Sequence, residues 1–217
     1  KRNNKVVLEI NIKKKYLEKI DMLKELELKL SKNPLFVELS TSKNFLMDLG
    51  FILESTKSID NLSKLDLTKK GLMAAEINEC NEILLTEMIE NKFFDNMSFE
   101  EIFGTLGIFI EEKENDEILV SDLEITSEMK YVLRDISELN LNLDDKALKY
   151  NIYYNPYISL SFVECSYQWA KGIDFGEIYK NMKIDIYEGN FVKNIMKVYN
   201  ICNEIIYISE IIGNTQL

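Results

Sequence analysis

The feature that most constrains the fold of this chain is its scarcity of residues that interrupt a helix. The 217 residues include only two prolines, Pro34 and Pro156, and eight glycines. Proline removes a backbone donor and clashes with the preceding helical turn, and glycine is the next weakest helix former. The sequence therefore predicts long helices with few interruptions.

The charge and the missing histidine exclude several classes of function. The chain has no histidine, 26 basic and 37 acidic residues, and a net charge of −11. Without imidazole there is no Ser-His-Asp or Cys-His nucleophile and no histidine-based zinc site. The acidity argues against a protein that coats nucleic acid through bulk positive charge. With 46% hydrophobic and 29% charged residues, the composition is that of one or two globular domains.

The three cysteines, Cys80, Cys165 and Cys202, are odd in number and form no C-x-x-C pair. This pattern predicts free buried thiols in an intracellular, reducing compartment, and leaves nucleus and cytoplasm open. There is no apolar run of about 18 residues and no signal peptide, so we expect a soluble protein without a membrane partner. The chain begins at Lys1 without a methionine, which suggests a fragment of a longer protein.

The first forty residues combine two patterns. Residues 5–12 are β-branched and partly alternating, which predicts a strand. A helix is expected next and should end at Asn33-Pro34, because the residue before a proline is disfavoured in helices. Its apolar residues with helical spacing are Tyr16, Ile20, Leu23, Leu26 and Leu30.

The middle of the chain is predicted from the same periodicity. Helices are expected over residues 41–49, 71–94 and 121–139. A polar loop is expected over 54–66, and a less regular stretch over 140–156.

A capping box marks the start of another helix. The Ser98 hydroxyl can accept a hydrogen bond from the Glu101 amide while the Glu101 carboxylate accepts one from the Ser98 amide. The helix is expected to run to about residue 112, with Gly104 and Gly107 inside it. A phosphate-binding loop would need glycines between a strand and a helix. Close packing against another helix is therefore the favoured explanation.

Three helices are expected after Pro156. The first ends near Gly172, a C-cap residue, and the second begins at Asp174, a good N-cap. The last spans residues 188–212 and ends at Gly213. Together these patterns predict an all-α helical bundle with a small extended N-terminal segment.

No catalytic, cofactor or metal site is predicted within the chain. It contains no phosphate loop, no dinucleotide-binding glycine pattern and no calcium loop. Adjacent carboxylates such as Glu100-Glu101 and Asp144-Asp145 would point about 100° apart on a helix, so a solvated face explains them. The residues alone describe a helical binding module.

Two segments of the sequence carry far more specific information about the family of the chain than its composition does. Residues 70–113 begin KGLMAAEINECNEILLTEMI, and residues 166–217 begin SYQWAKGIDFGEIYKNMKIDIYEG and end in IIGNTQL. Together they resemble the C-terminal helical domain, called DSHCT, of the exosome-associated, Ski-type superfamily-two DExH-box RNA helicases. The matching residues are Lys70-Gly71, Ala74, Glu76-Ile77, Leu84-Leu85-Thr86-Glu87-Met88, Trp169-Ala170, Gly172, Phe175, Ile178, Glu188-Gly189 and Ile212-Gly213-Asn214.

The N-terminal part extends this resemblance. The stretch KIDMLKELELKLSKNPL is similar to the helix with which the family returns from its arch insertion. The resemblance therefore divides the chain into residues 1–40, a returning arch segment of strand plus helix, and residues 41–217, the helical bundle.

The resemblance implies a concrete function. The chain would be the C-terminal domain of an ATP-dependent 3′-to-5′ RNA helicase that delivers RNA to an exosome-type nuclease assembly. It would pack in cis on RecA-like motor domains, which would hold ATP and Mg²⁺ and whose motifs are missing here. The helix over 188–212 would be the ratchet helix that faces single-stranded RNA.

The resemblance also names RNA-binding residues: Lys193, Lys197 and Asn200. The family's arginine after Glu-Gly falls on Lys193, its following basic pair on Met196-Lys197, and its acidic residue on Asn200. Lysine keeps the charge of arginine but loses its planar, bidentate fork. Two lysines one helical turn apart are also typical of a solvated face.

Two alternatives stay open at this stage. Trp169 has the chemistry of a base-stacking residue, although a core anchor between helices is the favoured role. The chain as a whole could also be a stand-alone, non-catalytic helical scaffold or adaptor that binds protein partners. The strong acidity, and Leu72 in place of a family arginine, favour the scaffold.

Overall fold

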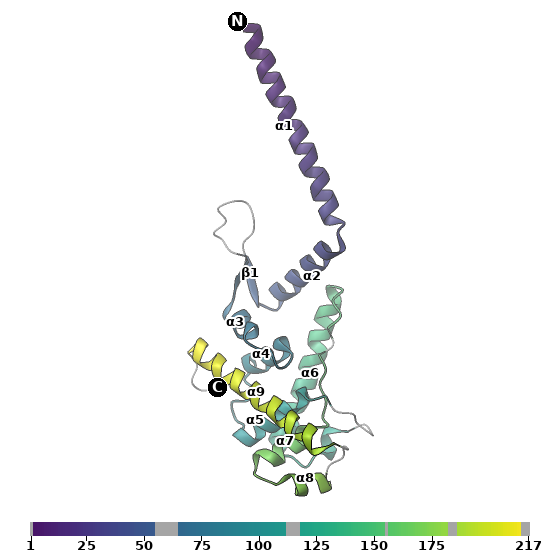
Figure 1. Cartoon of the computed structure of the whole chain (residues 1–217), viewed down its shortest axis with the longest axis vertical. Helices are drawn as coiled ribbons and strands as arrows, with labels where there is room; N and C mark the ends of the chain where they lie inside the picture. Colours follow the sequence, from purple (N-terminus) through teal and green to yellow (C-terminus); the bar gives the residue numbers. More distant parts are fainter. Residues whose placement is uncertain (1, 55–64, 112–117, 155, 182–185, 214–217) are drawn as a thin grey trace. The chain divides into compact units, whose positions relative to one another are not determined.

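The computed structural model describes residues 2–54, 65–111, 118–154, 156–181 and 186–213, and within the first helix it describes the side chains of residues 15–29. The chain divides into two compact units, Lys1–Phe45 and Leu46–Leu217. Helices dominate both units, so the predicted all-α class is confirmed (Figure 1).

The first unit contains α1 (Arg2–Ser31) and most of α2 (Pro34–Asp48). The strand predicted over residues 5–12 is wrong, because α1 runs through it. A strand needs a partner for its backbone groups, whereas extending a helix satisfies them internally and adds one bond per residue. The predicted extended N-terminal segment is therefore helical.

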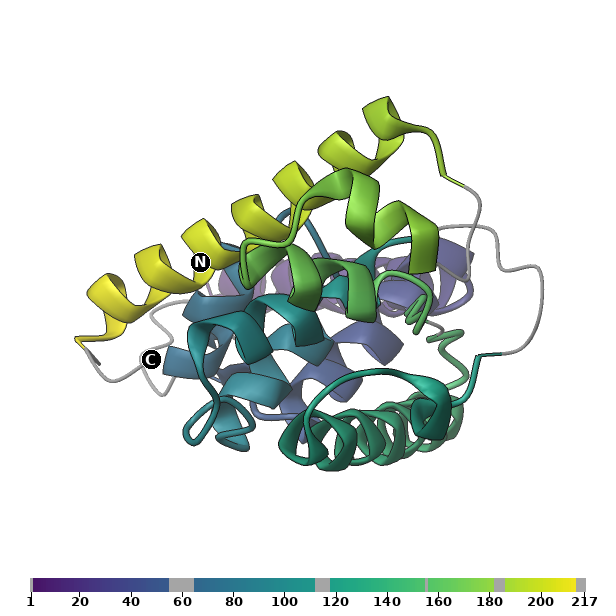
Figure 2. The ribbon, with the colours of Figure 1, turned by 90° about the horizontal axis from the view of Figure 1, so that it is seen from below.

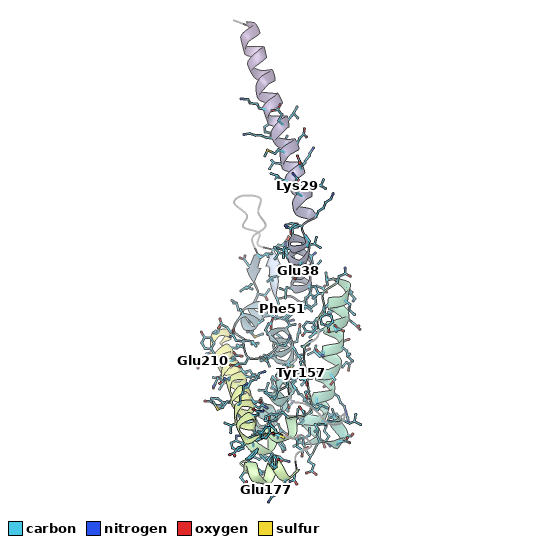
Figure 3. The ribbon with its side chains drawn as sticks, turned by 45° about the vertical axis from the view of Figure 1, so that its right-hand side comes forward. Lys29, Glu38, Phe51, Tyr157, Glu177 and Glu210 are labelled. Carbon is cyan, nitrogen blue, oxygen red and sulfur yellow. The ribbon has the colours of Figure 1, made fainter. Side chains whose placement is uncertain are left out.

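The break predicted at Asn33-Pro34 is confirmed. Proline occupies the first position of α2, where its missing N–H is not needed. The Asn33 side chain accepts a hydrogen bond from the amide of Leu35 at 3.0 Å. The helix predicted over 41–49 thus begins earlier than expected. Figure 3 shows the α1 side chains around Lys29, which pairs with Glu25 at 2.8 Å.

The second unit is a bundle in which α9 lies along one side and α6 along the opposite side, with α4 and α5 between them (Figures 1 and 2). Its helices are α3 (Lys69–Ala75), α4 (Glu82–Glu90), α5 (Phe99–Leu106), α6 (Ser127–Lys149), α7 (Val163–Ala170), α8 (Phe175–Asn181) and α9 (Glu188–Ile212). Single 3₁₀ turns follow α5 at Gly107–Phe109 and precede α6 at Val120–Asp122.

The described β-structure is one short antiparallel pair, β1 (Ile52–Glu54) and β2 (Leu65–Leu67). It falls at both ends of the loop predicted over 54–66, and residues 55–64 lie outside the described part of the chain. The core of the unit consists of nearly inaccessible apolar side chains, which include Met73, Leu84, Leu85, Met88, Leu106, Met129, Leu133, Ile136, Phe162, Phe191 and Val198.

The capping box is confirmed. The Ser98 amide donates to Glu101 Oε2 at 2.8 Å, and the Glu101 amide donates to Ser98 Oγ at 3.3 Å. The helix predicted over 71–94 is instead two helices, because the Asn81 side chain accepts from the Leu84 amide at 2.8 Å and so starts α4.

The irregular stretch predicted over 140–156 is wrong for its first ten residues. Helix α6 continues to Lys149, and Leu143 and Ala147 extend the buried stripe that begins at Met129. Asn140 lies on the same stripe between Ile136 and Leu143. A polar residue at a core-facing position therefore hid the helical period.

Helices α5 and α7 approach until one backbone contacts the other. A methyl group at Gly104 would lie 2.7 Å from Tyr167 Cβ and 3.1 Å from Tyr167 Cα. A methyl group at Gly107 would lie 2.9 Å from the Phe162 carbonyl oxygen and 3.0 Å from Val163 Cα. The two glycines thus permit close packing against α7, as the sequence predicts. The helix expected to run to about residue 112 is shorter, however, because α5 ends at Leu106 and Gly107 begins the 3₁₀ turn that follows it.

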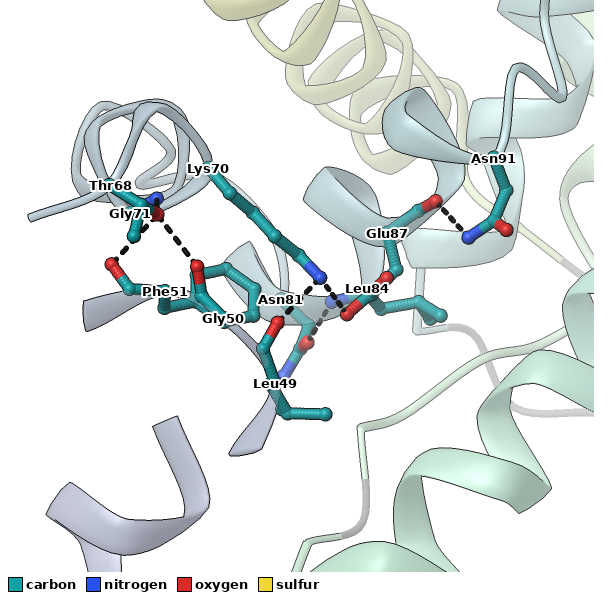
Figure 4. A network of polar contacts seen from close by, with 10 residues as sticks. All are labelled: Leu49, Gly50, Phe51, Thr68, Lys70, Gly71, Asn81, Leu84, Glu87 and Asn91. Carbon is teal, nitrogen blue, oxygen red and sulfur yellow. Dashed lines mark hydrogen bonds and ion pairs between the residues drawn. The ribbon is translucent and has the colours of Figure 1, made fainter. Parts of the chain in front are cut away.

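An ion pair ties α3 to α4 and to the turn before β1 (Figure 4). The Lys70 ammonium pairs with the Glu87 carboxylate, donates to the Leu49 carbonyl at 2.8 Å, and lies 4.7 Å from the centroid of the Phe51 ring. Only 18% of the Lys70 side chain and 11% of the Glu87 side chain are exposed. Each charge is therefore largely removed from water and depends on the other.

We predict that Gly104→Ala lowers the free energy of unfolding by about 1–3 kcal/mol, because α5 and α7 must separate to admit the methyl group. Gly189→Ala is the matched control, since nothing lies within 4 Å of that position. It should be neutral or stabilising by up to about 1 kcal/mol. Urea unfolding measures both, and equal effects of the two variants would contradict the packing.

Lys70→Met should lower the free energy of unfolding by about 3–5 kcal/mol, because it leaves the Glu87 carboxylate buried without its partner. Adding Glu87→Leu to this variant should recover much of the loss. Thermal and urea unfolding check this prediction, with the exposed neighbour Lys69→Met as control. A Lys70 variant no less stable than the Lys69 variant would show that the pair contributes little.

Candidate nucleic-acid interface

Helix α9 is the element on which the candidate interface is built. It matches the span predicted over residues 188–212 and ends at Gly213, whose φ of 65° is the left-handed C-cap expected there. One face of the helix packs on the bundle through residues that are all buried: Phe191, Ile195, Val198, Ile201, Ile205 and Ile208.

The first turn of α9 is fixed by a cluster of aromatic rings. The Phe191 ring centroid lies 5.5 Å from Trp169 of α7, 4.8 Å from Phe175 of α8 and 5.5 Å from Phe162. Phe191 itself is 1% exposed. Tilted and edge-on ring pairs of this kind stabilise a structure beyond the area they bury. They anchor the first turn of α9 to α7 and α8.

A groove opens beside this cluster, between α5, α7 and α9. We call it the aromatic groove. It encloses about 450 Å³. It is lined by Phe99, Phe103, Trp169, Val192, Met196 and Tyr199, with Phe191 beneath them.

Several side chains of the aromatic groove are exposed to solvent. Phe99 is 62% exposed, and Val192, Met196 and Tyr199 are each about half exposed. Trp169 is 39% exposed while it packs edge-on against Phe191. The tryptophan is therefore a packing anchor, as favoured from the sequence, and also presents part of its ring to solvent.

The three residues predicted to bind RNA differ in their surroundings. Lys193 is exposed. The Lys197 ammonium donates to the Phe109 carbonyl at 3.2 Å, and the Asn200 amide donates to Glu79 Oε1 at 3.2 Å. Lys197 and Asn200 thus hydrogen-bond within the bundle, while their spacing of i+4 and i+7 places them on the same side of α9 as Lys193.

Glu204 continues this inward polar row by one turn. Its carboxylate accepts from the amides of Asn78 at 3.0 Å and Glu79 at 3.3 Å. Burial, together with the negative charge of Glu204, raises the pKa of the nearby Cys80 thiol far above its usual range. Lys197, Asn200 and Glu204 form what we call the polar seam, which joins α9 to the loop between α3 and α4 and to the turn after α5.

The other described residues were compared with the requirements of a metal site and of a membrane-spanning helix. Its Cys, Asp and Glu residues form no group of three or more that could hold a metal ion. The three cysteines are free, and burial raises the pKa of Cys165 to about 12 and of Cys202 to about 11. None of the described helices is long and apolar enough to cross a membrane.

Sequence reasoning missed Met196 and Tyr199 as surface residues. The spacing of Val192, Met196 and Tyr199 follows i, i+4 and i+7, which is a helical stripe of its own. Because α9 is apolar on its inward face as well, the outer stripe could not be distinguished by periodicity alone.

Comparison with known proteins shows which family this chain resembles. Residues 64–217 match the DSHCT (NUC185) domain. The chain is 29% identical over 215 residues to the ATP-dependent RNA helicase mtr4 of Schizosaccharomyces pombe, covering 93% of this chain and 18% of that protein. It is 30% identical over 178 residues to the antiviral helicase SKI2 of Saccharomyces cerevisiae, covering 76% of this chain and 13% of that protein.

The human exosome RNA helicase MTR4 is 27% identical over 187 residues, which cover 83% of this chain and 16% of that protein. The chain therefore spans less than a fifth of the length of each of these relatives.

The different surroundings of the two lysines predict different effects on stability. Lys197→Met should lower the free energy of unfolding by about 1–2 kcal/mol, because it removes a charged donor from the Phe109 carbonyl. Lys193→Met, its matched control one turn earlier, should change that free energy by less than about 0.5 kcal/mol. Urea unfolding measures the free energy of unfolding of both variants. Equal losses of that free energy would contradict the assignment of Lys197 to the polar seam.

Proposed function

Since the match covers most of its length, the chain belongs to the DSHCT (NUC185) domain family, and we propose that it is the C-terminal domain of an ATP-dependent RNA helicase that contacts single-stranded RNA through α9. The family resemblance recognised in the sequence is thereby confirmed. The observation that carries the proposal is that the match extends from β2 to the end of α9.

The surface of α9 supports a role in RNA contact. Lys193 supplies an exposed positive charge, and the aromatic groove begins at the neighbouring residue Val192. The phosphate chain of RNA is attracted to lysine, and its bases have apolar faces. Lys197 and Asn200 lie on the same side of α9 and belong to the proposed contact, and their hydrogen bonds to the bundle would hold the helix in place.

The chemistry of the proposed helicase would lie outside these 217 residues. RecA-like motor domains in cis would bind ATP and Mg²⁺, because the chain itself has no phosphate loop. The bundle would pack on those domains and close the channel for the strand, which moves 3′ to 5′ toward an exosome-type nuclease assembly. Free cysteines fit a reducing intracellular compartment.

A second candidate function is a scaffold that binds proteins. The observation that favours it is the exposed apolar surface of the aromatic groove on a chain of net charge −11. The reading frame upstream of Lys1 separates the two candidates. A phosphate loop and a DExH box encoded there support the helicase, and an unrelated domain supports the scaffold.

Lys193→Glu should weaken binding of the complete protein to single-stranded RNA uniformly across sequences, because one phosphate contact is lost. The slope of log affinity against log salt concentration should become less steep by about 0.7. Fluorescence anisotropy over a series of salt concentrations measures this slope.

Lys146→Glu is the matched control for this experiment. Lys146 is exposed on α6, on the opposite side of the bundle from α9 (Figure 2). The Lys146→Glu substitution introduces the same change of charge as Lys193→Glu. It should leave the slope of log affinity against log salt concentration unaltered. If both variants bind RNA as the wild type does, α9 does not contact phosphate at Lys193.

A further inference from the structure

We propose that Glu79, in the loop between α3 and α4, positions Asn200 for the RNA contact by holding the nitrogen of its side-chain amide. The carbonyl oxygen of that amide then accepts a hydrogen bond from a donor group of the strand. This inference rests on the proposed function and names the chemistry that Asn200 recognises. The donor is a ribose 2′-hydroxyl or a base N–H group, and chemically altered strands separate these two sources.

The hydrogen bond to Glu79 fixes which way the Asn200 amide is turned. Asn200 Nδ2 donates to Glu79 Oε1 at 3.2 Å. An ionised carboxylate only accepts hydrogen bonds, whereas an asparagine amide donates through its nitrogen and accepts through its oxygen. The nitrogen of Asn200 is therefore the atom that faces Glu79. The carbonyl oxygen, at the other end of the amide, is left for a different partner.

The carbonyl oxygen of Asn200 is accessible to such a partner. The Asn200 residue is half-buried. Within the described part of the chain its side chain makes no other hydrogen bond, and Oδ1 is not one of the buried side-chain atoms that lack a partner. The oxygen therefore reaches solvent. A ligand can approach it while the hydrogen bond to Glu79 stays in place.

Glu79 is itself held by α9. Its backbone amide donates to Glu204 Oε2 at 3.3 Å, and the preceding amide of Asn78 donates to Glu204 Oε1 at 3.0 Å. Glu204 lies one turn beyond Asn200 on the same helix. The loop is thus bonded to α9 through its backbone as well as through the Glu79 side chain. The carboxylate that orients Asn200 is therefore fixed in turn.

The charges along this side of α9 favour a donor group, and not a phosphate, at Asn200. Lys193 and Lys197 lie seven and three residues before it, on the same side of the helix, and attract the phosphates of a strand. The carboxylates of Glu79 and Glu204 repel a phosphate at Asn200 itself. A 2′-hydroxyl or a base N–H is uncharged and suits the carbonyl acceptor there.

Glu79→Gln tests the positioning role, because charge and positioning predict opposite results. Removing a negative charge should by itself strengthen RNA binding. The glutamine amide both donates and accepts, however, so Asn200 is no longer held in one orientation. We expect the complete protein to bind oligouridine roughly 2- to 10-fold more weakly, which is the effect of losing one hydrogen bond. Fluorescence anisotropy of a labelled strand at constant salt concentration measures the affinity.

Glu82→Gln is the matched control for this experiment. Glu82 is exposed at the first residue of α4, so the substitution makes the same change of charge three residues further along the chain. This variant should bind oligouridine at least as tightly as the wild type. The double variant Glu79→Gln with Asn200→Asp exchanges donor and acceptor within the pair and keeps the net charge. It should recover most of the affinity that Glu79→Gln loses, because residue 200 again offers an acceptor to the strand.

Two altered strands identify the donor group. A 2′-deoxy strand lacks the ribose hydroxyl, and a strand of N3-methyluridine lacks the base N–H. The wild-type protein should bind one of them more weakly than it binds oligouridine. Glu79→Gln should cause no further loss with that strand, because the hydrogen bond to Asn200 is already missing.

The inference is overturned if Glu79→Gln binds oligouridine as tightly as Glu82→Gln does. It is also overturned if Glu79→Gln weakens binding of all three strands by the same factor, since that result describes a purely structural role. In either case a loss of affinity in Lys193→Glu leaves the proposed RNA contact standing. If neither Lys193→Glu nor Glu79→Gln weakens binding, both the inference and the RNA contact of α9 are wrong.

Discussion

The close approach of α5 and α7 is the contact on which the candidate interface depends. Gly104 in α5 and Gly107 in the turn after it leave no side chain of their own in the way, so this segment approaches the backbone of α7 at Tyr167 and Val163. This contact brings Phe103 of α5 and Trp169 of α7 to one side of the bundle, where Phe191 packs against the tryptophan. The close packing of α5 on α7 therefore forms part of the surface against which α9 packs.

Two sets of residues alternate along the sequence of α9: one set holds the helix on the bundle and the other lines the aromatic groove. The polar seam of Lys197, Asn200 and Glu204 hydrogen-bonds to groups within the bundle and fixes the helix. The stripe through Val192, Met196 and Tyr199 faces the groove and stays accessible. A helix held by partly buried polar contacts can present a rigid outer surface, which lowers the entropic cost of binding a strand.

Features that depend on neighbouring residues could be predicted from the sequence. Features that depend on residues far away in the chain could not. The Ser98–Glu101 capping box, the break at Asn33-Pro34 and the C-cap at Gly213 are local, and all are confirmed. The strand over residues 5–12 is wrong because β-branched residues also extend a helix when no partner strand is present. The resemblance placed the predicted RNA contact on α9, whereas the hydrogen bond of Lys197 to Phe109, 88 residues away, could not be predicted from the sequence.

The central claim is that the outer face of α9 meets single-stranded RNA beside the aromatic groove. The most direct measurement is photocrosslinking of a strand containing 4-thiouridine to the complete protein, followed by mass spectrometry of the crosslinked peptides. We predict crosslinks within residues 192–199 of α9 and at Trp169. Crosslinks that fall on α6 and spare α9 would contradict the account.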